Sequence, residues 1–151
     1  LTSARTHGAR TAGAPGSRRS EMTFQVEIHA NGPAFDQRGE TERRVMLQRA
    51  VDAVAREGKN YVVGHLVTFI RKPTPFYWTQ IAVQQVRPHY SKVWDQLTTV
   101  YGPWLEGVSS HNASTRFKGY AAFRKQTQRL AGDVQRIAEP AVDEYVREMN
   151  S

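Results

Sequence analysis

The stretch QIAVQQVRPHYSKVWD, residues 80–95, decides the fold class because it predicts two β-strands between two long helical segments. Ile81 and Val83 share one face of the first strand and alternate with other side chains, as in a half-buried strand. The tripeptide Arg87-Pro88-His89 reverses the chain, and residues 90–95 return as the partner strand. Residues 98–101 could add a further short strand.

A long amphipathic helix is predicted before the hairpin, from about Glu40 to Arg71. Its apolar stripe recurs every three or four positions and consists of Leu47, Val51, Val54, Gly58, Tyr61 or Val62, His65 or Leu66, and Phe69. Gly58 and Gly64 each cost about 1 kcal/mol relative to alanine, so a bend or close packing is expected there.

A second helix is predicted after the hairpin, over residues 117–149, where the same spacing returns. Pro140 lies inside it and lacks an amide hydrogen, so it should kink or divide the helix. Before the first helix, Phe24, Val26 and Ile28 alternate with polar residues and predict a short strand. The fold class is therefore α+β: a small antiparallel β-sheet packed against two long α-helices.

The first 21 residues, LTSARTHGARTAGAPGSRRSE, have no apolar period and cannot bury enough surface to offset the entropy of ordering. We expect residues 1–21 to form a basic, flexible arm and residues 22–151 to form one domain. The chain carries a net charge of +7, which favours acidic partners such as nucleic acid. Its longest apolar run, residues 61–70, is half the ~20 residues that a membrane span needs, so no membrane contact is expected.

Residue types suited to catalysis or metal binding are present, but their spacing does not support either role. The chain has no cysteine, and none of its five histidines has a metal-ligand spacing such as H-x-x-x-H. Ser109 and His111 could supply a nucleophile and a base, with Asp95 upstream, but no G-x-S-x-G turn is present. The sequence therefore predicts no enzyme, no cofactor and no metal.

Basic and aromatic residues intermingle between positions 116 and 129. Such a mixture can stack bases and neutralise phosphates, although Tyr120 and Phe123 also fit the apolar stripe of the helix and so fit the core. The remaining basic face could line a DNA channel or contact a partner, and it consists of Arg116, Lys118, Arg124, Lys125 and Arg129.

The segment YGPWLEG, residues 101–107, predicts a one-turn helix with a large apolar surface. Gly102 permits a sharp turn, Pro103 suits the first helical position, and Gly107 can end the turn in a left-handed conformation. A polar loop of about ten residues then leads to Phe117. Long polar loops in compact domains usually have a function or are ordered by a partner.

The order V-Y-G-P-W-L-E-G, then S-S-x-N, then T-R-F-x-G-Y-x-x-F-R, within residues 100–124, resembles the neck or tail-completion family of long-tailed bacteriophages. The resemblance covers roughly residues 23–140. It implies a non-enzymatic, ring-forming α+β protein of the virion that joins the portal side of the neck to the tail tube around the DNA channel. During assembly such a protein is in the host cytoplasm.

The resemblance also implies partners and contact residues. The partners are other copies in a ring (a hexamer or dodecamer), neighbouring neck proteins such as the adaptor or stopper and the terminator, the tail-tube protein, and genomic DNA contacted without sequence selectivity. We expect residues 108–118 to reach a neighbouring subunit. The predicted ring interface comprises Tyr101, Gly102, Pro103, Trp104, Glu106, Gly107, Ser110, Asn112, Arg116 and Phe117.

Three alternatives stay open at this point. A tail terminator, which caps the finished tube, has a related fold. A small basic nucleic-acid-binding module would bind DNA as a monomer with strong salt dependence. A small hydrolase using Ser109 and His111 would lose its activity when His111 is substituted.

Overall fold

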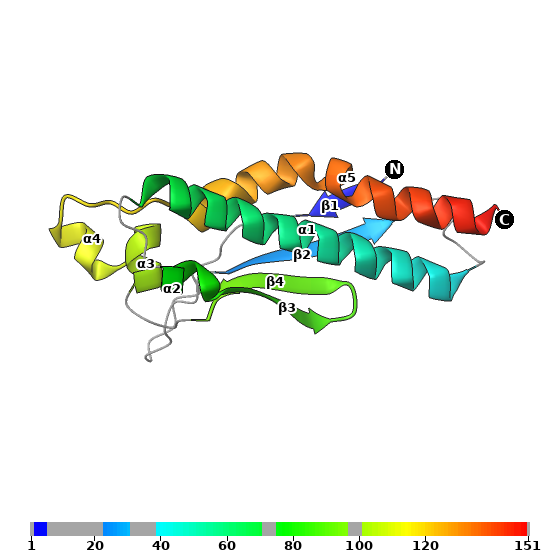
Figure 1. Cartoon of the computed structure of the whole chain (residues 1–151), viewed down its shortest axis with the longest axis horizontal. Helices are drawn as coiled ribbons and strands as arrows, with labels where there is room; N and C mark the ends of the chain where they lie inside the picture. The colour runs from blue at the N-terminus through cyan, green and yellow to red at the C-terminus, as the bar shows by residue number, and fades with distance from the viewer. Residues whose placement is uncertain (1, 6–22, 31–38, 71–74, 97–100, 151) are drawn as a thin grey trace.

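The computed structural model describes residues 2–5, 23–30, 39–70, 75–96 and 101–150, in which two long helices cover one face of a β-sheet (Figure 1). The elements in chain order are β1 (Thr2–Arg5), β2 (Thr23–Ala30), α1 (Glu40–Phe69), α2 (Pro75–Thr79), β3 (Ile81–Arg87), β4 (Tyr90–Asp95), α3 (Tyr101–Glu106), α4 (Ser110–Ser114) and α5 (Ala122–Met149). The predicted α+β class, with an antiparallel sheet against two long helices, is confirmed.

The sheet is antiparallel throughout, with the strand order β1-β2-β4-β3. The predicted hairpin is confirmed as β3–β4, with Val83 opposite Val93. β1 was not anticipated: it lies within the predicted arm, residues 1–21, and pairs with β2 from Thr2 opposite Ala30 to Arg5 opposite Glu27. Residues 6–22 lie outside the described residues.

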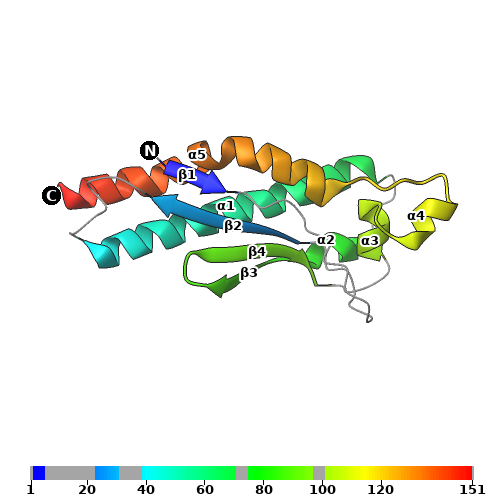
Figure 2. The same cartoon turned by 180° about the vertical axis from the view of Figure 1, so that it is seen from behind.

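The helices α1 and α5 lie antiparallel and side by side along the molecule (Figure 2). An ion pair of 2.7 Å joins Arg49 to Glu144 near one end, and a hydrogen bond of 3.0 Å joins Gln126 to His65 near the other. Between them, a Cβ on Gly58 would lie 2.4 Å from the Phe24 ring, so the close packing predicted at Gly58 is confirmed.

The core lies between this helix pair and the sheet. It is formed by alternate residues of the strands and by the inward stripes of the helices, among them Phe24, Val26, Val51, Val54, Val62, Leu66, Ile81, Val93, Leu130 and Val134. Removing these apolar side chains from water is the main favourable contribution to folding.

Several expectations from the sequence need correction. Phe69 is 52% exposed and does not join the core, and nothing lies within 4 Å of a Cβ on Gly64. α5 begins at Ala122 rather than at residue 117, because Gly119 and Ala121 have left-handed φ values of 84° and 53° that interrupt a helix. α5 runs through Pro140 without being divided, and Figure 1 shows it arched.

Two further differences concern the segments on either side of α3. Tyr101 begins α3 and is not part of a strand, while residues 98–100 lie outside the described residues. The loop expected after α3 contains α4, a single turn with a capping box between Ser109 and Asn112. The predicted one-turn helix over residues 101–107 is confirmed, and Gly107 ends it with a φ of 90°.

Candidate subunit-joining corner

The α3–α4 corner, which we define as residues 101–121, is closed by two glycines whose backbones touch. Gly107 and Gly119 have φ values of 90° and 84°. A Cβ on Gly107 would lie 2.2 Å from the carbonyl oxygen of Lys118, and one on Gly119 would lie 2.3 Å from the nitrogen of Gly107. The Tyr120 amide also donates to the Leu105 carbonyl at 2.6 Å. Only glycine allows the two segments to approach this closely.

Glu106 caps α5 from outside that helix. Its side chain is buried, and its two carboxylate oxygens accept the backbone N–H groups of Phe123 and Arg124, each at 3.0 Å. The residue at the N-cap position, Ala121, has no side chain that could do this, so Glu106 satisfies donors that the first helical turn leaves unpaired. Burial raises the pKa of Glu106, and the hydrogen bonds from the amides oppose that rise.

Asn112 holds the parts of the corner together through its side-chain amide. Its Nδ2 donates to the carbonyl oxygens of Trp104 at 2.9 Å and Phe117 at 3.1 Å, while its Oδ1 accepts the Ser109 amide at 3.0 Å. The ammonium of Lys118 donates to the Asn112 carbonyl at 2.9 Å. Asn112 is only 4% exposed, so these bonds are made away from solvent, where losing them costs most.

A row of aromatic rings connects the corner to the end of α1. The ring centroids are 4.7 Å apart for Trp104 and Phe117, 4.9 Å for Phe117 and Tyr120, and 6.3 Å for Tyr120 and Phe69. His65 continues the row, 4.6 Å from Phe69. Its Nε2 faces the Tyr120 carbonyl at 3.3 Å and must donate, so Nδ1 accepts from Gln126. Both ring nitrogens of His65 are therefore used in hydrogen bonds within the chain.

The start of α3 packs against the end of β4. A Cβ on Gly102 would lie 2.3 Å from Oδ2 of the buried Asp95, and the hydroxyl of Tyr77 donates to the same oxygen at 3.3 Å. Burial raises the pKa of Tyr77 well above its usual range, and the neighbouring Asp95 carboxylate adds to the rise. Tyr77 therefore stays a hydrogen-bond donor. Of the residues considered for a hydrolase, Asp95 lies at this contact and Ser109 caps α4.

The structure divides the ten predicted interface residues into two groups. Seven are buried or half-buried within the corner: Gly102, Pro103, Trp104, Glu106, Gly107, Asn112 and Phe117. Three are exposed: Tyr101, Ser110 and Arg116. For six of these seven, Pro103 being the exception, the contacts within the chain described above explain the residue type without a partner. The exposed group remains available for an intersubunit contact.

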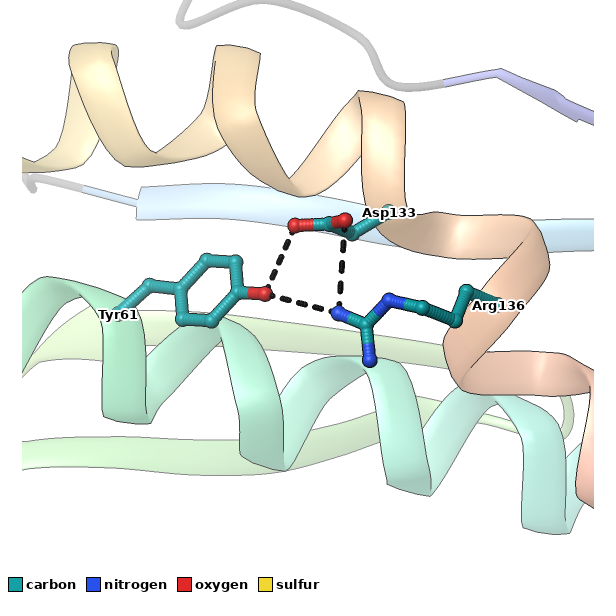
Figure 3. Close-up of polar contacts among 3 residues, drawn as sticks. All are labelled: Tyr61, Asp133 and Arg136. Atoms are coloured by element: carbon teal, nitrogen blue, oxygen red, sulfur yellow. Dashed lines mark hydrogen bonds and ion pairs between the residues drawn. The ribbon is translucent and has the colours of Figure 1, made fainter.

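The five basic residues predicted to face DNA or a partner are all exposed. One of them, Arg129, lies 4.4 Å above the ring of Tyr61. Tyr61 also belongs to a polar brace between α1 and α5 (Figure 3). In this brace the Tyr61 hydroxyl donates to Asp133 at 2.8 Å, and Arg136 contacts Tyr61 at 3.3 Å and Asp133 at 3.4 Å. The hydrogen bond from Tyr61 is the main cause that lowers the pKa of Asp133.

This brace was not predicted from the sequence, because its members come from two helices and no local pattern joins them. The inward roles of Glu106 and Asn112 were not predicted either, although the serine three positions before Asn112 is a capping-box signal.

Comparison with protein-family models, curated proteins and solved structures returns no significant match. Within the described ranges, no helix is long and apolar enough to cross a bilayer. The same residues contain no group of three or more histidines and carboxylates placed to hold a metal ion.

Proposed function

We propose that this protein is a structural component of a bacteriophage neck. In this role copies of the chain form a ring that completes the tail and joins it to the head around the DNA channel. The observation that carries the proposal is the α3–α4 corner. Its interior is fixed by the Gly107–Gly119 contact and by the buried Glu106 and Asn112, while its rim presents exposed side chains.

The rim combines apolar and basic groups in a fixed geometry. Tyr101 is 62% exposed and Val108 is 44% exposed, and Arg116 lies exposed nearby in sequence. Surfaces that are ordered before binding lose less conformational entropy when a partner docks. Exposed aromatic and arginine side chains are also the types most often found at the energetic centre of protein interfaces. This combination favours a joint between subunits.

Two alternatives make different use of the same features. A tail terminator would use the same corner and differ only in its position in the virion. A nucleic-acid-binding module would use the five exposed basic residues, and its affinity for DNA would fall steeply with salt because phosphate contacts release counterions. The exposed apolar side chains at the corner have no role in that second alternative.

Replacing the exposed apolar rim should block the joining of heads to tails. Trp104 is unsuitable for this test, because it packs on Phe117 within the chain. We therefore choose Tyr101→Ala with Val108→Ser, in a phage whose own copy of the gene is deleted and supplied in trans. The yield of infectious particles should fall by more than about tenfold, as expected for the loss of a central interface aromatic.

Electron microscopy of the lysate should then show filled heads beside free tails. The matched control is Arg56→Ala, an exposed change near the middle of α1 that should leave the yield unchanged. A folded double variant that supports the wild-type yield of joined particles would contradict the proposal.

A further inference from the structure

The charges along α5 run against the dipole of that helix. Residues 115–130 carry five basic side chains and no acidic one, and the first turn of α5 includes Arg124 and Lys125. Residues 139–150 carry four acidic side chains against the single basic Arg147. A helix dipole favours the opposite arrangement, with acidic groups at the N-terminus and basic groups at the C-terminus. The stability of α5 therefore does not explain where these charges lie.

Exposed large apolar side chains gather near the two ends of α5 where these opposite charges lie. Seven of the eight in the described part of the chain lie there: Val67, Phe69, Tyr101 and Val108 at one end, and Val45, Val146 and Met149 at the other. The row of rings places Phe69 beside the α3–α4 corner. A Cβ on Gly39 would lie 2.9 Å from the sulfur of Met149, which places the start of α1 beside the end of α5.

We call the first region the basic end: the α3–α4 corner, the last turn of α1 and the first two turns of α5. We call the second the acidic end: the first two turns of α1 and residues 139–150. Figure 1 shows them at opposite extremes of the long axis. A 28-residue helix is about 42 Å long, several times the screening length of about 8 Å at physiological salt. Each end therefore attracts partners independently.

We propose that the basic end of one copy docks on the acidic end of the next copy. The two ends carry opposite net charge, because Glu40 and Glu42 in α1 are balanced by Arg43 and Arg44 and the excess of carboxylates lies on residues 139–150. Both ends expose apolar side chains that such a contact would cover. A nucleic acid would occupy the basic end only and would leave the apolar, acidic end unexplained. The contact is head-to-tail, so it can be repeated, and repetition closes into a ring when the rotation between copies allows it.

This inference deepens the proposed function and rests on it for the role of the ring, but the contact itself is testable on purified protein. Two double variants are made, and each of them reverses the charge at one end only. Arg116→Glu with Lys125→Glu changes the basic end, and Glu139→Lys with Asp143→Lys changes the acidic end. All four side chains are exposed and none belongs to the hydrogen bonds that close the corner. Each double variant should weaken self-association by at least about 100-fold, because like charges would then meet.

The decisive variant combines all four changes. It has the same net charge as the wild type, and its two ends are again opposite in sign, so it should regain self-association. Sedimentation velocity at several salt concentrations measures this, and thermal melting by circular dichroism confirms that each variant is folded. If a double variant does not fold, Arg116→Gln with Lys125→Gln tests the same contact with a milder change.

Three results would overturn the inference: a wild-type chain that stays monomeric, a single-end variant that assembles like the wild type, or a fourfold variant that stays monomeric while folded. A basic-end variant that loses salt-dependent binding to duplex DNA while its self-association is unchanged would assign that end to nucleic acid. These readouts are separate from the virion yield of the Tyr101 and Val108 variant, so the neck function and the end-to-end contact can fail independently.

Discussion

Replacing Gly119 with alanine should destabilise the protein by about 3–5 kcal/mol, one of the largest effects expected for a single methyl group. The φ of 84° is unfavourable for any side chain that has a Cβ. The added Cβ would also lie 2.3 Å from the nitrogen and 2.4 Å from the Cα of Gly107. Both are backbone atoms, so neither can move away as a flexible side chain would. Equilibrium unfolding in urea measures the loss.

Gly132→Ala is the matched control, because the same substitution is made in the same region of the chain. Gly132 is exposed within α5, and a Cβ added there would have nothing within 4 Å of it. Alanine there should stabilise the protein by about 0.5–1 kcal/mol through its better helix propensity. Equal stabilities for the two variants would show that the contact between Gly107 and Gly119 does not hold the corner closed.

Replacing Glu106 with alanine should cost about 2–4 kcal/mol, because it removes a helix cap and leaves two N–H donors of α5 without acceptors. Glu106→Gln keeps the shape and one acceptor oxygen, so it should cost about half as much. Urea unfolding of the wild type and the two variants measures these differences in the free energy of unfolding. An alanine variant as stable as the wild type would mean that the cap contributes nothing to stability.

The stability of the wild type and that of the Glu106→Gln variant should depend differently on pH. Because burial raises the pKa of Glu106 in the folded state, the folded chain holds this proton more tightly than the unfolded chain. The contribution of Glu106 to stability is therefore fully present below the pKa of the unfolded state and declines as the pH rises through the folded pKa. The glutamine variant lacks this titration, so its stability deficit should shrink as the pH rises from 4 to 7. A deficit that grows over this range would show that the folded pKa is lowered.

The parts of the fold that were predictable are those set by local periodicity. The alternation in residues 80–95 predicted the hairpin, and the stripe through Val51, Val54 and Leu66 predicted α1, because each pattern depends on neighbours in the chain. β1 was missed because its four residues, TSAR, have no apolar alternation, and its partner strand is distant in the sequence. Phe69 fits the predicted stripe but is exposed, because α1 extends beyond the sheet-covered core at that end.

The candidate site was predictable only in outline. Gly107 was expected to end a helical turn in a left-handed conformation, and it does. The start of α5 could not be placed, because its cap comes from Glu106, which belongs to a different helix. The motif residues were expected to contact other copies, whereas the structure uses most of them to build the corner and leaves its rim exposed.

The cap on α5 also has a mechanical consequence. Since the carboxylate that caps α5 belongs to α3, tilting α3 would pull Glu106 away from the amides of Phe123 and Arg124. A displacement of α3 would therefore disturb the first turn of a 28-residue helix, whose last turn lies beside Gly39.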